Sequence, residues 1–384
     1  MGKLPLREWQ KQAMSRWEAE SHRGIVEVVT GGGKTVFALS CIDRLKPDTT
    51  LVVVPTAALL DQWWEESASF FDLSFDEINI VTGNKRIKSG TINIAVLNTA
   101  AKLQAEGRTR ECFLVVDECH KAASPLFRAC LDVPKVASLG LSATPERQYD
   151  DGLSEVLIPA LGPIIYQYSY KEAARDKVIV PFQLKNIVFE LEDENKQEYD
   201  KLTKSIALAI KKYGPEAPET IALYIKRTRV LNLSLNRVRL ALRLVASHRD
   251  RRVLVFHEDI EACNLIHQVL VQNSVRAGVY HSKLPVRERA EMLAGYRKGA
   301  LNVLITCRAL DEGFNVPETE VGIIAASTAT RRQRIQRLGR VLRPIRGKDN
   351  ATVYTLVATF PEIGRLQEEE ANLEGVAEVT WSQA

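Results

Sequence analysis

The residues of this sequence best suited to chemistry form a short glycine-rich loop, TGGGKT, at residues 30–35. Glycines let backbone N–H groups approach phosphate oxygens without Cβ clashes, and a helix starting near the loop adds its positive N-terminal dipole. The strict phosphate-loop pattern has another glycine where Val28 stands, so a plain glycine-rich turn is the alternative. We expect a lysine that reaches the β- and γ-phosphates and a threonine that ligates Mg²⁺. The candidate nucleotide-binding residues are Thr30, Gly31, Gly32, Gly33, Lys34 and Thr35.

Two adjacent carboxylates end the apolar segment LVVDECH, residues 114–120. Asp117, at the end of the segment, suits a Mg²⁺-holding acid, and Glu118 is placed to deprotonate an attacking water. A charged turn after a strand is the alternative when the segment is taken alone. Together with the glycine loop, the pair predicts hydrolysis of a nucleoside triphosphate.

A third group lies far along the chain, in QRIQRLGRVLRP. Phosphoryl transfer spreads negative charge over the equatorial oxygens, and an arginine supplied from the opposite side stabilises that charge. The surrounding residues 331–348 are rich in arginine and contain no acidic residue. A basic amphipathic helix on a solvated face is the alternative for this motif.

Short apolar runs rich in β-branched residues alternate with helical stretches through the first half of the chain. This pattern is typical of a parallel sheet with helices on both faces, in which ligands bind at the carboxyl ends of the strands. The pattern starts again in the second half, without a glycine–lysine loop. The predicted strands are 24–29, 50–55, 92–97, 112–117 and 136–143, then 252–257, 275–281, 302–307 and 320–327.

These elements predict an α/β protein with two domains in tandem, each a parallel sheet flanked by helices. We place the first domain at residues 1–168 and the second at 169–360. Between the halves, an edge strand in PFQLKNIVFEL precedes a charged helical insertion on the second domain, at about 191–249. Residues 361–384 are expected to be an acidic, solvated tail.

Composition excludes several classes of protein. A hydrophobic fraction of 45% and a charged fraction of 26% are those of an ordinary globular chain, and no apolar run has the length of a membrane span. The six cysteines form no C-x-x-C pair, which argues against a zinc ribbon or an iron–sulfur site. The N-terminus lacks the apolar core of a secretory signal. We expect a protein of the cytoplasm and nucleoid, or of the nucleus, that is not secreted.

The motifs TGGGKT, DECH and LSATPER, in this order, resemble motifs I, II and III of DExH-type superfamily 2 helicases. That family does not require the first loop glycine, so Val28 agrees with the family form. The sequences LREWQ, VVVPTAALLDQW and VLITCRALDEGFNVPE resemble its Q motif, motif Ia and motif V. LSATPER followed by DDG, SYKEAARDKVIVPF and the charged insertion resemble the XPB-like branch of DNA helicases. The resemblance implies two RecA-like domains and runs from Leu6 to Pro344.

The resemblance also implies roles for individual residues. Adenine contacts are implied for Arg7 and Gln10, and arginine fingers for Arg340 and Arg343. Coupling roles are implied for His120, Ser142 and Thr144, and His120, next to a phosphate site, would couple that site to a neighbouring domain. Further nucleotide or domain-interface contacts are implied for Asp311, Gly313, Gln336 and Arg337. Nucleic-acid contacts are implied for Pro55, Thr56, Thr99, His281 and Thr306. Trp63 and Trp64 are open between base stacking and core packing.

The predicted activity is that of an ATP-dependent DNA helicase or translocase that uses ATP and Mg²⁺. A translocase on duplex DNA that does not separate strands, an RNA helicase and a non-catalytic ATP-gated clamp are the alternatives. Nucleic acid is the expected partner, contacted mainly through its backbone, with DNA favoured over RNA. The basic part of the insertion, residues 201–229, either extends the nucleic-acid groove or is a solvated face. We expect a monomer without membrane contact and cannot name a protein partner.

Overall fold

The structure is a computed structural model, and it describes residues 5–146, 151–179, 182–307, 319–326, 351–370 and 377–384. This part of the chain divides into two compact units between Asp176 and Lys177. The sequence placed the boundary earlier, after residue 168. Helix α6 (Tyr170–Arg175) belongs to the first unit, where the Tyr168 hydroxyl donates to Asp176 across that helix at 3.0 Å.

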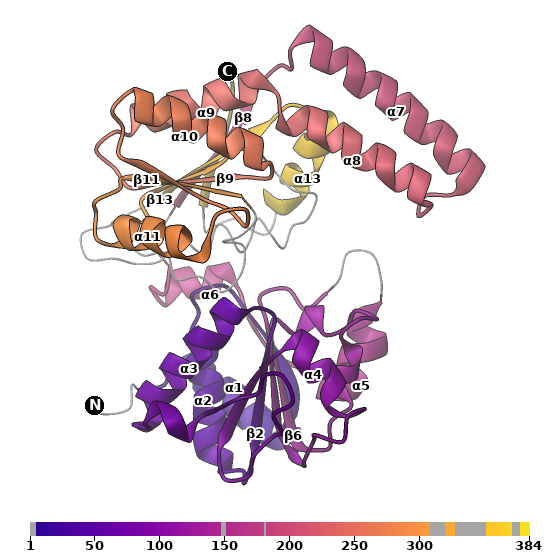
Figure 1. Cartoon of the computed structure of the whole chain (residues 1–384), viewed down its shortest axis with the longest axis vertical. Coiled ribbons are helices and arrows are strands. Elements are labelled where there is room, and N and C mark those ends of the chain that lie inside the picture. Colours follow the sequence, from indigo (N-terminus) through magenta and orange to yellow (C-terminus); the bar gives the residue numbers. More distant parts are fainter. Residues whose placement is uncertain (1–4, 147–150, 180–181, 308–318, 327–350, 371–376) are drawn as a thin grey trace. The chain divides into compact units, whose positions relative to one another are not determined.

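The first unit is built on a parallel sheet in the strand order β3-β4-β2-β5-β6-β1-β7 (Figure 1). All five predicted strands are present. The two strands that sequence reasoning missed are β3, which is only two residues long, and β7 at the other edge. The strands are β1 (Arg23–Val28), β2 (Thr50–Val54), β3 (Asn79–Ile80), β4 (Ile92–Val96), β5 (Cys112–Asp117), β6 (Lys135–Ser142) and β7 (Ile164–Tyr168).

Helices cover both faces of this sheet, as the periodicity predicts. On one face, Trp9 packs on Phe37 and Tyr168, and Trp17 packs on Phe113. On the other face, helix α4 and the helices before β7 close a core around β2 and β5. The helices are α1 (Glu8–Ala19), α2 (Lys34–Leu45), α3 (Ala57–Phe71), α4 (Leu97–Leu103) and α5 (Ile158–Leu161), with short helical turns at Phe75–Glu77, Cys119–Lys121, Arg128–Leu131 and Leu153–Leu157.

The second unit has a parallel sheet in the order β10-β11-β9-β12-β13-β8-β14. The four strands predicted for this half are confirmed. Helices α9 and α10 lie on one face, and α11 covers the other (Figure 1). The strands are β8 (Phe182–Val188), β9 (Val253–His257), β10 (Ala277–Tyr280), β11 (Val303–Cys307), β12 (Val321–Ile324), β13 (Ala351–Val357) and β14 (Ala377–Gln383); the helices are α7 (Asp193–Tyr213), α8 (Pro218–Asn232), α9 (Leu235–Ser247), α10 (Ile260–Gln272), α11 (Val286–Arg297) and α13 (Phe360–Glu370).

The expected acidic tail has regular structure where the structure describes it, although Glu368 and Glu378 are exposed as predicted. Residues 360–370 form α13, and β14 pairs in parallel along the whole of β8. Glu370 accepts hydrogen bonds from Trp381 of β14 at 2.7 Å and from Asn186 of β8 at 3.0 Å. The Glu370 carboxylate, one of the acidic groups from which a solvated tail was predicted, therefore bridges β14 and β8 through hydrogen bonds. Because β14 lies outside β8, the strand expected at the edge of the sheet is interior.

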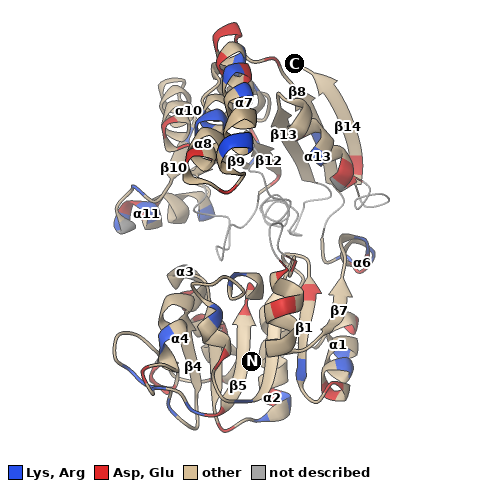
Figure 2. Cartoon of the chain, turned by 90° about the vertical axis from the view of Figure 1, so that its right-hand side faces the viewer, with Lys and Arg blue, Asp and Glu red and all other residues tan. Residues whose placement is uncertain are grey.

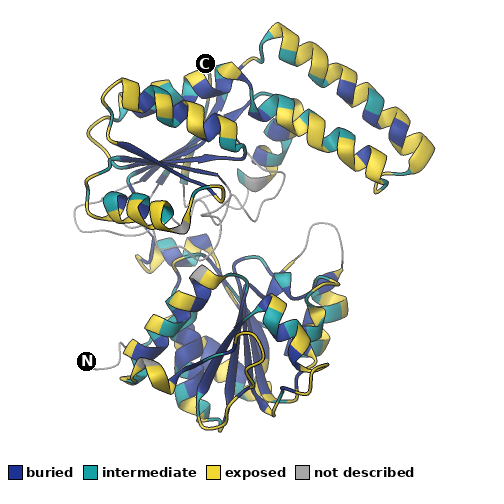
Figure 3. Ribbon diagram, viewed as in Figure 1, coloured by how far each residue is buried: buried dark blue, intermediate teal, exposed yellow. Residues whose placement is uncertain are grey.

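The predicted helical insertion has two different parts. Helices α7 and α8 form a hairpin that extends away from the sheet of the second unit, and most of its surface is exposed (Figure 3). Helix α9 instead buries Val238, Ala241 and Val245 in the core beneath the sheet. The insertion into the second unit is therefore the α7–α8 hairpin alone. Helix α9 is a core helix, as the spacing of its apolar residues indicates.

Two further properties bear on the composition argument. No helix in the described ranges is both long and apolar enough to cross a membrane. All six cysteines are buried, and none is in a disulfide.

Candidate nucleotide-hydrolysis site

The glycine-rich loop connects β1 to α2, and its glycines meet two steric demands, a left-handed backbone and a close approach to other residues. Gly31 and Gly33 have φ of 83° and 97°, the left-handed region that favours glycine. A Cβ on Gly32 would lie 2.5 Å from the Val28 side chain and 2.9 Å from the carbonyl oxygen of Val29. Val28 is fully buried and packs beneath the loop. The loop is therefore a tight backbone cradle, and the phosphate-binding geometry does not need a glycine at position 28.

Helix α1 holds this cradle from the side. The Trp9 indole donates to the Gly32 carbonyl at 3.1 Å, and the Gln10 amide donates to the Gly33 carbonyl at 3.0 Å. The Gln10 side-chain oxygen accepts from the Arg7 backbone N–H at 2.8 Å. Gln10 is buried and touches the loop directly, so the residue expected to read adenine also orders the loop. Sequence reasoning missed Trp9, whose apolar ring gave no sign of a polar contact.

The parallel sheet brings the loop and the acidic pair to one edge. The Lys34 ammonium lies 3.4 Å from Glu118, and both side chains are about nine-tenths buried, at 12% and 11% exposure. Lys34 begins α2 directly after β1, and Glu118 follows β5 directly. Strands β1 and β5 both flank β6, and the carboxyl ends of parallel strands share an edge. Residues 84 positions apart in the sequence thereby become direct neighbours.

Asp117 is a buried carboxylate held by two donors. The Trp63 indole donates to one oxygen at 2.8 Å, and the backbone N–H of Glu118 donates to the other at 2.9 Å. Burial, and then the adjacent Glu118 charge, raises the pKa of Asp117 above its usual value, while Lys34 and the hydrogen bonds oppose the rise. Trp63 is fully buried, so it is a core residue that orients an acid. The alternative of base stacking by Trp63 is wrong.

Glu118 has an unusual backbone. Its φ of 48° puts a non-glycine residue in the left-handed region, a conformation found at functional sites where the surroundings enforce it. The conformation turns the chain sharply after β5, and Cys119 and His120 are buried behind it. One Glu118 oxygen faces Lys34, while the other has no hydrogen-bond partner among the described residues and lies 3.5 Å from the His120 ring.

Three candidate coupling residues lie together behind the acidic pair. His120 Nδ1 is 3.1 Å from the Ser142 hydroxyl, and the same hydroxyl accepts from the Thr144 backbone N–H at 3.1 Å. Ser142 ends β6, the neighbour of β5, so the contact joins the ends of two adjacent strands. The His120 side chain alone therefore separates the Glu118 carboxylate from Ser142, the second residue of LSATPER.

The candidate nucleic-acid contacts lie at carboxyl ends of strands within each unit. Pro55 and Thr56 follow β2, and Thr99 lies on α4 after β4, its parallel neighbour. In the second unit, His281 follows β10 and Thr306 lies near the end of β11. Both are buried, and His281 Nε2 is 3.0 Å from the Asn264 side-chain oxygen. Burial lowers the pKa of His281, which favours a neutral ring.

The remaining candidates lie outside the described residues. They are Asp311, Gly313, Gln336, Arg337, Arg340 and Arg343. Their expected roles stay predictions.

Comparison with known proteins agrees with this geometry. Residues 3–147 match the family described as Type III restriction enzyme, res subunit, and residues 236–344 match the helicase conserved C-terminal domain. The chain is 29% identical to the DNA 3′-5′ translocase XPB2 of Sulfurisphaera tokodaii, over 89% of this chain and 79% of that protein. It is 27% identical to the DNA 3′-5′ helicase XPB of Kineococcus radiotolerans, over 92% of this chain and 60% of that one.

Solved structures support the same fold. Yeast Dbp5 bound to RNA and ADP BeF3 has a TM-score of 0.63 at 16% identity, covering 98% of this chain and 89% of that one. The Hef helicase domain of Pyrococcus furiosus has a TM-score of 0.58 at 18% identity, covering 95% and 98%. Two RecA-like units, a phosphate loop and an acidic pair define an ATP-hydrolysing helicase of superfamily 2. Within that superfamily, the two domain matches and these relatives support an XPB-like helicase.

Proposed function

We propose that this chain couples ATP hydrolysis to 3′-to-5′ movement along DNA and separates the duplex as it moves. The observation that carries the proposal is the cluster formed by Lys34, Glu118, His120 and Ser142, which links a hydrolytic site to the segment after β6 by direct contacts. The relatives named as DNA 3′-5′ translocase and helicase support the substrate and the direction.

The site fits ATP with Mg²⁺. The loop leaves no room for a Cβ at Gly32, and the pKa of Asp117 is raised by burial and then by the adjacent Glu118 charge, both of which a bound cation would offset. No group of three or more His, Cys, Asp and Glu residues forms a metal cage among the described residues. Magnesium in such sites is held by one or two carboxylates plus the substrate phosphates. Thr35 and Asp117 would hold Mg²⁺, which would neutralise charge on the β- and γ-phosphates.

The residues of the first unit then divide the chemistry. The loop N–H groups and Lys34 bind the phosphates, while Arg7 and Gln10 bind the adenine. Glu118 takes a proton from the attacking water, because its carboxylate lies beside Lys34 and one of its oxygens accepts no hydrogen bond from the part of the chain that the structure describes. His120 lies beside that oxygen and senses the change in charge through Glu118.

In this proposal the arginine motif of the second half of the chain supplies positive charge to the transferred phosphoryl group. Arg340 and Arg343 stabilise the transition state, Gln336 and Arg337 bridge to the first unit, and Asp311 and Gly313 complete the nucleotide contacts. Closure on ATP and opening after hydrolysis alternate the grip on one strand at Pro55, Thr56, Thr99, His281 and Thr306.

The first test is the steady-state ATPase rate with matched single-stranded DNA, duplex DNA and RNA. The proposal expects DNA to stimulate turnover more than RNA. Greater stimulation by RNA would favour an RNA helicase, and the absence of any stimulated turnover would favour an ATP-gated clamp. A strand-displacement assay beside a triplex-displacement assay then separates a helicase from a duplex translocase. The likeness to a translocase and to restriction-enzyme subunits makes the duplex translocase the second candidate.

Replacing Glu118 by Gln tests the assignment of the base. The variant keeps the size of the side chain but cannot accept the proton, so we expect turnover to fall about 10²- to 10⁴-fold. Binding of a fluorescent ATP analogue should stay within about threefold, because the phosphate contacts remain. Glu111→Gln is the matched control, since Glu111 is exposed at the opposite end of the same strand region. DNA-stimulated turnover of Glu118→Gln at the unmodified rate would contradict the assignment.

A further inference from the structure

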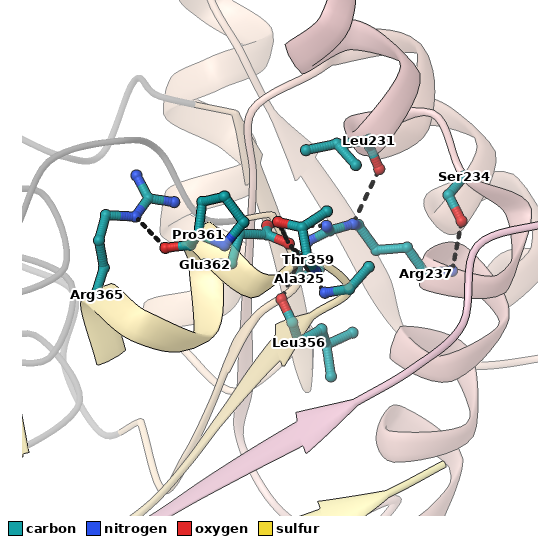
Figure 4. Close-up of polar contacts among 10 residues, drawn as sticks. Leu231, Ser234, Arg237, Ala325, Leu356, Thr359, Pro361, Glu362 and Arg365 are labelled. Carbon is teal, nitrogen blue, oxygen red and sulfur yellow. Dashed lines mark hydrogen bonds and ion pairs between the residues drawn. The ribbon is translucent and has the colours of Figure 1, made fainter. Parts of the chain in front are cut away.

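A buried arginine joins four elements of the second unit. Arg237, in the first turn of α9, is fully buried, and its guanidinium donates to three backbone carbonyls and one carboxylate (Figure 4). Nε donates to Leu231 at 3.0 Å, and one terminal nitrogen donates to Ala325 at 2.7 Å and Leu356 at 3.1 Å. The other terminal nitrogen donates to Glu362 at 3.1 Å. The side chain also lies over the Phe189 ring at 5.0 Å.

The two carbonyls on one nitrogen belong to neighbouring strands. Ala325 directly follows β12, and Leu356 is near the end of β13. The parallel ladder between these strands is recorded as far as Ile324 and Thr355. Arg237 therefore holds the two strands together one residue beyond their last ladder pair, at their carboxyl ends.

Glu362 connects Arg237 to the turn after β13, and we call Arg237 and Glu362 together the clamp. Its second oxygen accepts from the backbone N–H groups of Ala358 and Thr359, at 2.9 and 3.1 Å, and from the Thr359 hydroxyl at 3.1 Å. Both charges are withdrawn from water, with Arg237 at 0% and Glu362 at 5% exposure. A buried ion pair of this kind is a poor source of net stability, because desolvation offsets the attraction. The directed hydrogen bonds of the pair instead fix the relative positions of the backbone segments that they join.

The position of the clamp connects it to the arginine motif. The chain leaves β12 at Ala325 and begins β13 at Ala351. The arginine motif, with Arg340 and Arg343, lies in the connection between these two residues. This connection starts at Ala325, whose carbonyl accepts from Arg237. We propose that Arg237 and Glu362 are positioning residues for ATP hydrolysis, which fix the point where the arginine-bearing segment leaves the sheet. The inference rests on the proposed function, since it acts through Arg340.

The test is a double-mutant cycle between Arg237→Lys and Arg340→Ala, measured by DNA-stimulated ATPase. Lysine keeps the charge but cannot present a planar fork to carbonyls on two strands and a carboxylate together. We expect Arg237→Lys to lower kcat about tenfold while KM for ATP and the affinity for an ATP analogue stay within about twofold. In the Arg340→Ala background, Arg237→Lys should lower kcat no further, because the residue it positions is gone.

Two further variants keep the test decisive. Arg243→Lys makes the same change at an exposed arginine of α9 and should leave kcat unaltered. Glu362→Gln approaches the clamp from the other side and should show the same split between kcat and KM. Thermal unfolding of each variant is measured in parallel.

The proposal is overturned if Arg237→Lys leaves kcat unaltered, or if its effect multiplies with that of Arg340→Ala. It is also overturned if both Arg237→Lys and Glu362→Gln fail to fold, because the pair would then serve stability alone. Failure of the proposed function would be seen separately, as no DNA-stimulated turnover in the unmodified protein or as normal turnover in Arg340→Ala.

Discussion

The chemistry of the site depends on a few side chains whose neighbours give them their function. Val28 occupies the position of a glycine in the strict phosphate-loop pattern, yet it is the buried surface against which Gly32 closes. Substitution of the glycine would have to move either the Val28 side chain or the Val29 carbonyl. The looser pattern is therefore a different way to pack the same cradle.

The structure gives Trp63 a role that the sequence did not predict. Its aromatic ring suggested a nucleic-acid contact or core packing, whereas its indole N–H holds Asp117. Residues that hydrogen-bond to metal ligands in this way affect metal affinity about 10- to 100-fold when they are replaced.

We predict that Trp63→Phe raises the Mg²⁺ concentration for half-maximal ATPase about tenfold. Phenylalanine keeps most of the packing but leaves one Asp117 oxygen without its donor. A Mg²⁺ titration at fixed ATP measures the effect, and turnover at saturating Mg²⁺ should remain within about threefold. Trp64→Phe, at the partly exposed neighbour, is the control. An unshifted Mg²⁺ titration in Trp63→Phe would show that the hydrogen bond has no part in metal binding.

Among the elements, the α7–α8 hairpin has many charged side chains, and most of its surface is exposed. Lys211 and Lys212 end α7, near the turn into α8, and both are exposed. Figure 2 shows basic residues spread along these helices, with acidic residues also present. Arg227 instead packs over Tyr199 and donates to Thr203, so it links the two helices of the hairpin. The basic composition of the insertion therefore contains both structural and solvent-facing cations.

We predict that Lys211→Ala/Lys212→Ala weakens DNA binding and reduces its salt dependence. Each lost phosphate contact lowers the slope of log affinity against log salt by about one, so the slope should fall by about two. Fluorescence anisotropy at several salt concentrations measures both quantities, and kcat at saturating DNA should be unaltered. Lys298→Ala, at an exposed lysine following α11, is the control. An unchanged slope in the double variant would indicate a solvated face.

At the scale of the whole molecule, the candidate phosphate-binding residues and the candidate arginine fingers lie in different halves of the chain. The first unit contains the phosphate loop, the acidic pair and the helix that holds the loop. The arginine motif belongs to the second half of the chain, between β12 and β13. This division separates the residues that bind ATP from the arginines expected to act on the transition state.

We therefore predict that Arg340→Ala lowers DNA-stimulated turnover by about 10³-fold or more and leaves ATP-analogue affinity within about threefold. Single-turnover hydrolysis and equilibrium binding measure the two quantities. Arg287→Ala, which removes an exposed arginine paired with Glu291 on α11, should alter neither. Equal losses of binding and turnover in Arg340→Ala would argue that the arginine binds the ground state.

The sequence by itself determined the two α/β halves, the strands that carry the motifs and the residue types of the hydrolytic site. Those features follow from local information, since β-branched runs, glycine spacing and adjacent acids are visible along the chain. Only the tertiary structure decided that Trp9, Trp63 and Arg237 serve the site or its frame. Their contacts join residues 23, 54 and up to 125 positions apart, and no local pattern records such pairings. The same reason applies to the C-terminal segment, whose acidic composition suggested a tail although residues 377–383 pair with β8 as a strand of the sheet.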